Sequence, residues 1–162
     1  MNLKLKRWLA LVGLVFVCQG VGALGAISTV QSLDSWYSAL NKPFFNPPNW
    51  IFGPVWTSLY LMMAVSSWLV LGTEIKNKEL KRRALFLFVL QLVLNACWSF
   101  LFFGMRHPFY GLVDIVLLCI FIFLTIKSFQ RISKWAAILL WPYFAWVSFA
   151  TVLNFSLWWL NR

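Results

Sequence analysis

Residues 109–129 read FYGLVDIVLLCIFIFLTIKSF, an apolar run that carries only Asp114 and, near its end, Lys127 as charged residues. A helix needs about 20 mostly apolar residues to cross the roughly 30 Å hydrocarbon core of a bilayer. Only helices and closed barrels satisfy their backbone hydrogen bonds in lipid, and this run lacks the regular alternation of a barrel strand. The stretch therefore predicts a transmembrane helix.

Four more stretches of this kind lie along the chain, each bounded by charge, proline or a polar cluster. They cover approximately residues 5–27, 50–72, 84–103 and 135–160. Together with residues 109–129 they predict an all-α membrane protein, a bundle of five transmembrane helices that forms one domain over residues 1–162. A structured loop rich in proline and tryptophan is expected between the first and second helices.

The composition agrees with a lipid environment. Hydrophobic residues make up 62% of the chain and charged residues only 11%, whereas soluble domains have about 25% charged residues. This excludes a soluble enzyme or binding domain, and it excludes a disordered chain. The net charge of +10 does not indicate a nucleic-acid partner, because the basic residues sit in short clusters between the apolar runs. The three cysteines are widely spaced inside these runs, so neither a metal site nor a disulfide is expected.

The basic residues also predict how the helices are oriented. Eleven of the 14 lysines and arginines fall in the N-terminal tail and in the second and fourth loops, which lie on one side of the membrane. Cytoplasmic segments carry this excess. We therefore expect a multi-pass protein with a cytoplasmic N-terminus and a C-terminus on the opposite side. The first stretch also has features of a secretory signal, but its length favours a retained helix.

The aromatic residues predict a ligand site inside the bundle. Aromatics make up 19% of the chain, more than interfacial belts explain, and three tryptophans lie deep in predicted spans. Each shares a helix face with polar, small or aromatic residues: Trp56 with Tyr60, Trp98 with Asn95, and Trp146 with Tyr143, Ala150 and either Leu153 or Asn154. Such faces suit the wall of a cavity for a large, flat, mostly apolar ligand. They suit tight interhelical packing as well, and the pattern alone does not separate the two.

Two further features bear on function. Four of the six prolines fall between Pro43 and Pro54 among several aromatic residues. Proline stiffens the backbone, so this loop is expected to fold as a lid over the mouth of the bundle. Asp114 is the only acid inside an apolar run, and an acid in the membrane is costly. A functional role and a structural hydrogen bond near the interface both remain open for it.

Three blocks of sequence match a known family. The first is Trp36-Tyr37-x-x-Leu40-x-Lys42-Pro43-x-x-x-Pro47-Pro48-x-Trp50-x-x-Gly53-Pro54-Val55-Trp56-x-x-Leu59-Tyr60. The second is Asn95-x-x-Trp98, followed by Phe102-Phe103-Gly104 and Gly111-Leu112-Val113-Asp114. The third is Pro142-Tyr143-x-x-Trp146-x-x-Phe149-Ala150-x-x-Leu153-Asn154. In these blocks the chain resembles the translocator proteins of the TspO/MBR family, also called tryptophan-rich sensory proteins or peripheral benzodiazepine receptors.

The resemblance implies a membrane receptor that binds tetrapyrroles such as protoporphyrin IX and other flat hydrophobic ligands, with no required cofactor beyond such a ligand, and that regulates porphyrin levels or a stress response. It implies a pocket under the first loop, between the first, second, third and fifth helices. The ligand-binding residues expected on the combined grounds are Trp36, Trp50, Trp56, Tyr60, Asn95, Trp98, Tyr110, Tyr143, Trp146, Ala150, Leu153 and Asn154. Ligand carboxylates are expected to meet loop amides or a cation such as Lys42.

Two other functions stay open. The resemblance also implies a light-dependent enzyme that degrades porphyrin with Trp56 and Trp146 as the catalytic residues, or a transporter of tetrapyrrole or sterol. The family's sterol motif is degraded here, because Phe155 stands at the tyrosine position and no basic residue follows before Arg162. This departure and the short C-terminus favour a bacterial cell membrane as the location. Membrane lipid is the expected surrounding, and a homodimer is expected without an assigned interface.

Overall fold

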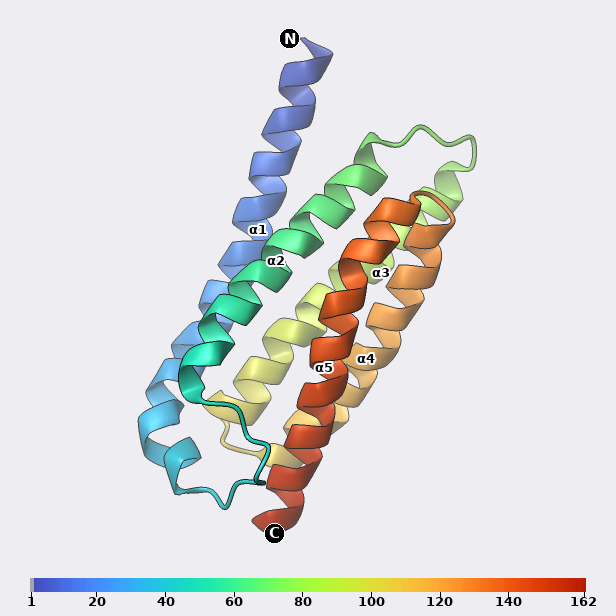
Figure 1. Ribbon diagram of the computed structural model, residues 1–162. Helices are drawn as coiled ribbons and strands as arrows, with labels where there is room; N and C mark the ends of the chain where they lie inside the picture. The colour runs from blue at the N-terminus through green and yellow to red at the C-terminus, as the bar shows by residue number, and fades with distance from the viewer. Residues whose placement is uncertain (1) are drawn as a thin grey trace.

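A computed structural model describes residues 2–162 as a bundle of five long helices (Figure 1). The helices are α1 (Leu3–Ser32), α2 (Asn49–Gly72), α3 (Lys78–Ser99), α4 (Pro108–Gln130) and α5 (Lys134–Leu160). Short π-helical turns extend two of them: η1 (Leu33–Tyr37) continues α1, and η2 (Phe100–Gly104) continues α3. The predicted all-α architecture with five membrane-spanning helices is confirmed, and all five are long and apolar enough to cross a bilayer.

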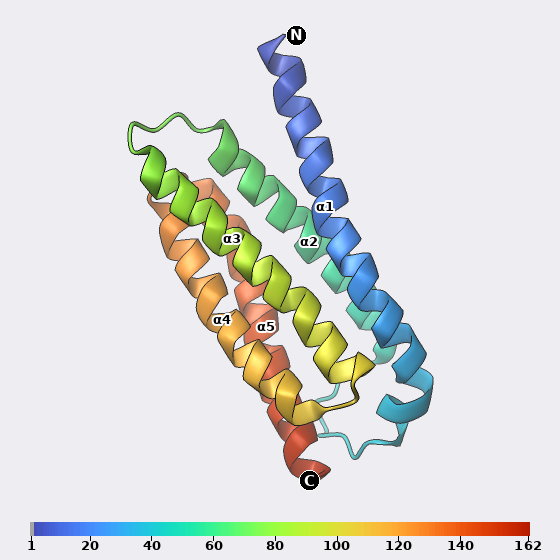
Figure 2. The same cartoon turned by 180° about the vertical axis from the view of Figure 1, so that it is seen from behind.

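The helices form a ring in which sequence neighbours are not always spatial neighbours. α4 packs extensively against both α3 and α5, α2 packs against α5 and α1, and α1 also contacts α3. The order around the bundle is therefore α1, α2, α5, α4, α3. Figures 1 and 2 show that the two termini lie at opposite ends and that the N-terminal part of α1 diverges from the other helices. This leaves α1 as the least buried of the five spans.

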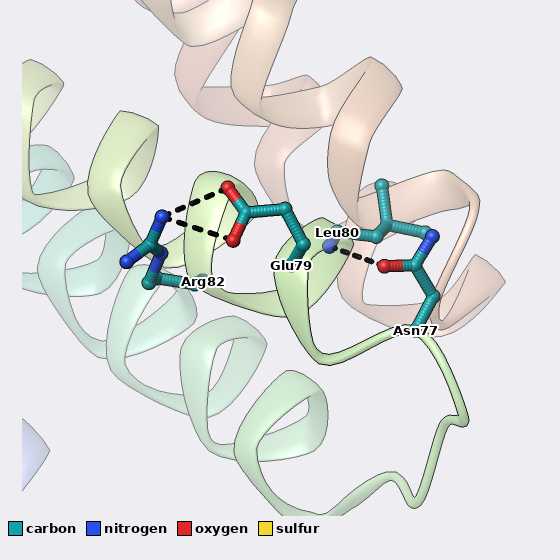
Figure 3. Close-up of polar contacts among 4 residues, drawn as sticks. All are labelled: Asn77, Glu79, Leu80 and Arg82. Carbon is teal, nitrogen blue, oxygen red and sulfur yellow. Dashed lines mark hydrogen bonds and ion pairs between the residues drawn. The ribbon is translucent and has the colours of Figure 1, made fainter.

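Local sequence signals set the helix boundaries. The side chain of Asn77 caps α3 by accepting a hydrogen bond of 2.9 Å from the backbone N–H of Leu80 (Figure 3). In the same turn Glu79 pairs with Arg82 at 2.9 Å, an exposed contact that adds little stability. Ser133 caps α5 in the same way as Asn77 caps α3. α5 therefore begins at Lys134, one residue before its predicted span, whereas α3 begins at Lys78, six residues before its predicted span, because charged residues form its first turns.

The first helix departs most from expectation. The apolar stretch predicted a span that ends near residue 27, whereas the helical conformation continues through α1 and η1 to Tyr37. Buried contacts with the end of α3 stabilise this extension: Ser32 Oγ donates a 2.7 Å hydrogen bond to the carbonyl oxygen of Phe103. The rings of Trp36 and Tyr37 pack against Phe102 at 5.6 and 6.3 Å between centroids. Hydropathy along the chain does not register these tertiary contacts, so the span prediction ended too early.

The segment between η1 and α2, residues 38–48, is held to the end of the bundle. Asn161 at the end of α5 exchanges two hydrogen bonds with the backbone of Asn41, at 2.9 and 3.0 Å. The hydroxyl of Tyr37 donates to Asn46 Oδ1 at 2.7 Å. The ring of Phe45 also packs against Phe149, with 6.3 Å between centroids. The expected structured loop is therefore present, and it crosses the end of the bundle near the C-terminus (Figure 1).

Candidate ligand-binding cavity

A cavity of about 460 Å³ lies between α1, α2 and the end of α3. Its walls are largely apolar, and the polar groups that line it are few. The lining residues are Gln19, Gly22, Ala23, Gly25, Ala26, Thr29, Val30 and Leu33 from α1 and η1, Asn49, Trp50, Phe52, Gly53, Trp56, Thr57 and Tyr60 from α2, and Trp98, Ser99 and Phe103 from α3 and η2. Several of them, including Ala23, Val30 and Gly53, are exposed on the surface of the bundle. The cavity is therefore open on the side where α1 and α2 meet lipid.

Glycines allow α1 to approach the other walls of the cavity closely. A Cβ atom at Gly22 would lie 2.5 Å from the ring of Tyr60, which is shorter than any normal contact. A Cβ atom at Gly25 would lie 2.8 Å from the hydroxyl of Ser99. Because a larger side chain would push α1 outward at either position, these two glycines fix the distance between α1 and the aromatic wall.

Two indoles meet on the inner wall. The rings of Trp56 and Trp98 are 6.3 Å apart between centroids, and Tyr60 lies 5.7 Å from Trp56. Trp98 is oriented by its N–H, which donates a 3.1 Å hydrogen bond to Asn154 Oδ1 on α5. The amide of Asn154 in turn donates to the carbonyl oxygen of Pro108 at 2.8 Å. Since its only donor points toward α5, Trp98 presents its apolar ring system to the cavity and to its aromatic neighbours.

A buried polar network closes the bundle behind this wall. The hydroxyl of Tyr60 donates to Asn95 Oδ1, and the amide of Asn95 donates to the hydroxyl of Tyr143 at 2.9 Å. The hydroxyl of Tyr143 donates onward to Gln91 Oε1 at 2.8 Å. These four side chains are at most 4% exposed, so the series of hydrogen bonds joins α2, α3 and α5 out of reach of any solvent. Satisfied networks of this kind rigidify an interior.

The expected residues of α5 do not line the cavity. Tyr143 and Asn154 are fully engaged in the hydrogen bonds just described, and Ala150 and Leu153 are buried in the core. Trp146 packs between Phe52 and Phe149, with 6.1 and 5.6 Å between ring centroids. Its N–H is inaccessible and has no hydrogen-bond partner among residues 2–162. The pocket expected between four helices is in fact bounded by three, because side chains from α5 fill the space on its own side.

The other predicted site residues fall into three groups. Trp50 lines the cavity and is 73% exposed, so it stands at the mouth. Asn95 lies behind the wall, where it accepts a hydrogen bond from the hydroxyl of Tyr60. Trp36 packs edge-on to Phe102 outside the lining, and Tyr110 stacks on His107 at 4.0 Å on the far side of α3. The structure thus brings Trp50, Trp56, Tyr60 and Trp98 to one cavity and leaves Trp36 and Tyr110 away from it.

Lys42 lies outside the cavity as well. Its ammonium group donates to the carbonyl oxygens of Ser38 and Leu40 at 2.8 and 3.2 Å. It also lies 5.2 Å from the centre of the Tyr37 ring. Lys42 therefore stabilises the end of the first helix and the start of the loop in this structure.

The first helix was expected beside the pocket, but none of its residues was among the predicted site residues. Gly22 and Ala26 of α1 belong to the cavity wall. Gln19 was also missed; its amide donates to the carbonyl oxygen of Thr57 at 3.0 Å and closes one end of the gap between α1 and α2. The available signal was the run of small residues at helical spacing that includes Gly22, Gly25, Ala26 and Thr29, which covers one face of the helix.

Comparisons with known proteins agree with this architecture. The chain is 48% identical over 156 residues to the tryptophan-rich protein TspO of Chlorobaculum tepidum, which covers 96% of this chain and 98% of that protein. It is 37% identical over 154 residues to protein CrtK of Rhodobacter capsulatus, covering 94% of each chain. It is also 37% identical over 158 residues to the translocator protein of Bos taurus, covering 96% of this chain and 92% of that one.

The match to a family extends over nearly the whole bundle. A sequence model of the TspO/MBR family covers residues 14–160, which include all of α2 to α5 and most of α1. The resemblance carried by the three sequence blocks is confirmed, and the chain is an integral, multi-pass membrane protein that belongs to the TspO/MBR family.

Proposed function

We propose that the protein is a membrane receptor that binds a flat hydrophobic ligand of the tetrapyrrole class in the cavity between α1, α2 and α3. The observation that carries this proposal is the meeting of Trp56, Trp98 and Tyr60 on one wall of a hollow of about 460 Å³. Ligand pockets have volumes of roughly 300–1,000 Å³ and mostly apolar walls with few polar groups. Membership of the TspO/MBR family supports a receptor or binding role.

The geometry favours a planar aromatic ligand. Aromatic rings prefer offset or edge-on contact with other rings, and each such contact adds about 0.5–1.5 kcal/mol beyond the burial of area. Trp56 and Trp98 lie at 32° to each other and present a nearly continuous aromatic surface. The polar network behind this surface keeps Tyr60 from turning away. A macrocycle would therefore meet a wall that is already arranged for it, which lowers the entropic cost of binding.

The opening determines how the ligand reaches the cavity. The exposed lining residues lie on the lipid-facing side of α1 and α2, and the mouth at Trp50 lies at the end of the bundle with the structured loop. By the distribution of basic residues this end faces away from the cytoplasm, with the N-terminus on the cytoplasmic side. A bacterial cell membrane is the proposed location, and the similarity to the Chlorobaculum tepidum protein supports it.

Two indoles provide the decisive test. Trp56→Phe is expected to weaken protoporphyrin IX binding by about tenfold, because the wall loses its central indole. Trp146→Phe is the matched control: the same substitution in an indole that does not line the cavity should leave the affinity within about twofold. The dissociation constant is measured by quenching of the remaining tryptophan fluorescence in purified protein. Unchanged affinity in Trp56→Phe would contradict the proposed site, and an equal loss in both variants would move it toward α5.

Illumination of the complex distinguishes the enzymatic alternative from a receptor. Photo-oxidative degradation through Trp56 and Trp146 needs both indoles near the ligand, whereas only Trp56 lines the cavity. Illumination of the complex, with porphyrin absorbance followed over time, is expected to show the same slow decay in wild type and Trp146→Phe. A decay that depends on Trp146 would favour the enzyme.

The transport alternative predicts flux of porphyrin into proteoliposomes, whereas a receptor predicts none.

A further inference from the structure

A second hollow lies on the opposite side of α3, and the proposed receptor function does not use it. It is a shallow groove between η2 and the first three turns of α4. Its lining residues are Leu101, Phe109, Tyr110, Val113, Asp114 and Leu117. The α4 residues among them recur at helical spacing, so they form one face of that helix. Apart from Asp114 and the hydroxyl of Tyr110, every side chain in the groove is apolar.

Asp114 is the unusual member of this set. It is 7% exposed, and its Oδ2 atom is inaccessible and accepts no hydrogen bond from any of residues 2–162. An unpaired buried carboxyl group is costly in any interior and especially costly at membrane depth. The structural role considered for Asp114 from the sequence requires a donor within the bundle, and the described part of the chain supplies none to Oδ2. Because Oδ2 is enclosed, a donor that enters the groove from outside the chain meets the other carboxyl oxygen, Oδ1, which is not enclosed.

The surroundings restrict what that donor is. Val113 and Leu117 on either side of Asp114 are 49% and 43% exposed and, as α4 spans the membrane, they face acyl chains. A ligand that enters the groove from lipid is therefore an amphiphile that carries a hydrogen-bond donor to the depth of Asp114. A hydroxyl group costs much less to bring there than an ammonium group. It also satisfies the carboxyl group in either protonation state, since both states accept a hydrogen bond.

We propose that the groove between η2 and α4 is a binding site for a neutral, hydroxyl-bearing amphiphile, whose hydroxyl group donates to Asp114 while its apolar part lies along Val113, Leu117 and Leu101. Phe109 and Tyr110 close the groove at the end near the third loop. The site is separate from the cavity between α1 and α2, because the two share no lining residue. It takes a different class of ligand, with a single polar contact in place of an aromatic wall.

The test uses a monoacylglycerol and its blocked analogue. Binding of radiolabelled 1-oleoylglycerol to the purified full-length protein in detergent micelles is expected to be saturable. Its diacetate, which has the same chain but no hydroxyl donor, should bind about tenfold more weakly, because a hydrogen bond to a carboxyl group is lost. Asp114→Leu should reduce 1-oleoylglycerol affinity by a similar factor and abolish the difference between the two compounds. Asp34→Asn, at an exposed acid that does not line the groove, should change neither affinity.

A second variant keeps the test valid if Asp114→Leu fails to fold. Leu117→Trp retains the carboxyl group but fills the groove, and it should also weaken 1-oleoylglycerol binding by about tenfold. Occupancy has an independent reporter in Cys97, an exposed thiol on α3 one helical turn before Leu101. Its reaction with a maleimide should slow severalfold when 1-oleoylglycerol is bound and stay unchanged with the diacetate.

Three results would overturn the proposal. They are equal binding of the two compounds, unchanged affinity in both groove variants, and protection of Cys97 that depends on protein concentration without any amphiphile. The last result would assign the groove to contact with a second copy of the chain. Porphyrin quenching in the same variants separates this proposal from the receptor function, because the groove variants should leave the affinity for porphyrin unchanged.

Discussion

The two sides of α2 show how similar helix faces give a hollow in one place and a filled interface in another. On the side toward α5, the side chains of Gln91 and Asn95 from α3 and of Tyr143 from α5 are long and polar, and they hydrogen-bond to one another. Toward α1, the facing residues are small, including Gly22 and Gly25, and they leave the aromatic wall uncovered. Both sides are apolar overall and both carry aromatic residues. The difference teaches that the length of the facing side chains decides where a cavity forms: side chains that reach across close one side, and glycines leave the other open.

The largest effect is expected for a substitution on the filled side, the side of α2 toward α5. Asn95→Leu removes the donor and the acceptor that join Tyr60 to Tyr143, so two buried hydroxyl groups lose a partner. The free energy of unfolding should fall by roughly 2–4 kcal/mol, measured by denaturant titration in detergent micelles. Cys97→Ala, an exposed position on the same helix, is the control and should change it by less than about 0.5 kcal/mol. Equal stability of Asn95→Leu and wild type would show that the network does not hold the bundle together.

The second effect is expected for a substitution on the hollow side, the side of α2 toward α1. Gly22→Ala places a methyl group against the ring of Tyr60, which cannot turn aside without losing its bond to Asn95. Overpacking of this kind costs about 1–3 kcal/mol, and the displaced wall should weaken porphyrin affinity by about tenfold. Gly20→Ala, on the same helix with no atom within 4 Å of the added methyl group, should leave the affinity unchanged and should not lower the stability, because alanine favours a helix more than glycine does. If the two variants behaved alike, the close approach of α1 to Tyr60 would not define the cavity.

The smallest effect concerns the loop that crosses the end of both sides. Asn161→Ala removes the two hydrogen bonds that tie Asn41 to α5. Because these bonds are exposed, the stability should fall by only about 0.5–1 kcal/mol. Hydrogen exchange in residues 38–48 should accelerate severalfold, while exchange in α3 and α4 stays the same. Unchanged exchange in the loop would mean that the contacts of Tyr37 and Phe45 suffice to hold it.

The Trp56 and Trp146 pair tests the same contrast at the level of the ligand. The sequence treats these two indoles as equivalent, because both lie deep in apolar spans within motifs of the same family. The structure separates them: Trp56 faces the hollow side and Trp146 lies among Phe52 and Phe149 on the filled side. Different porphyrin affinities of the two phenylalanine variants would confirm that the contrast between the sides governs binding.

The sequence by itself determined the membrane class, the five spans and the family. Hydropathy adds along the chain, so a run such as residues 109–129 predicts a span whatever its neighbours are. The caps at Asn77 and Ser133 are local too; the start of α5 was predicted to within one residue, whereas α3 begins six residues before its predicted span because its first turns are charged and lie outside the apolar run. The continuation of α1 to Tyr37 was missed, because Phe102 and Phe103, which stabilise it, are far away in the sequence.

Only the tertiary structure decided which residues share a cavity. A helix face is known from the sequence, but the rotation of each helix about its axis depends on packing between segments far apart in the chain. That rotation turns Tyr143 and Asn154 into hydrogen-bond partners of α3 and brings the glycines of α1 to the cavity wall. It also leaves Asp114 without a partner for Oδ2 among the described residues. Contacts of this kind are set by complementary side-chain lengths across an interface, which no single segment encodes.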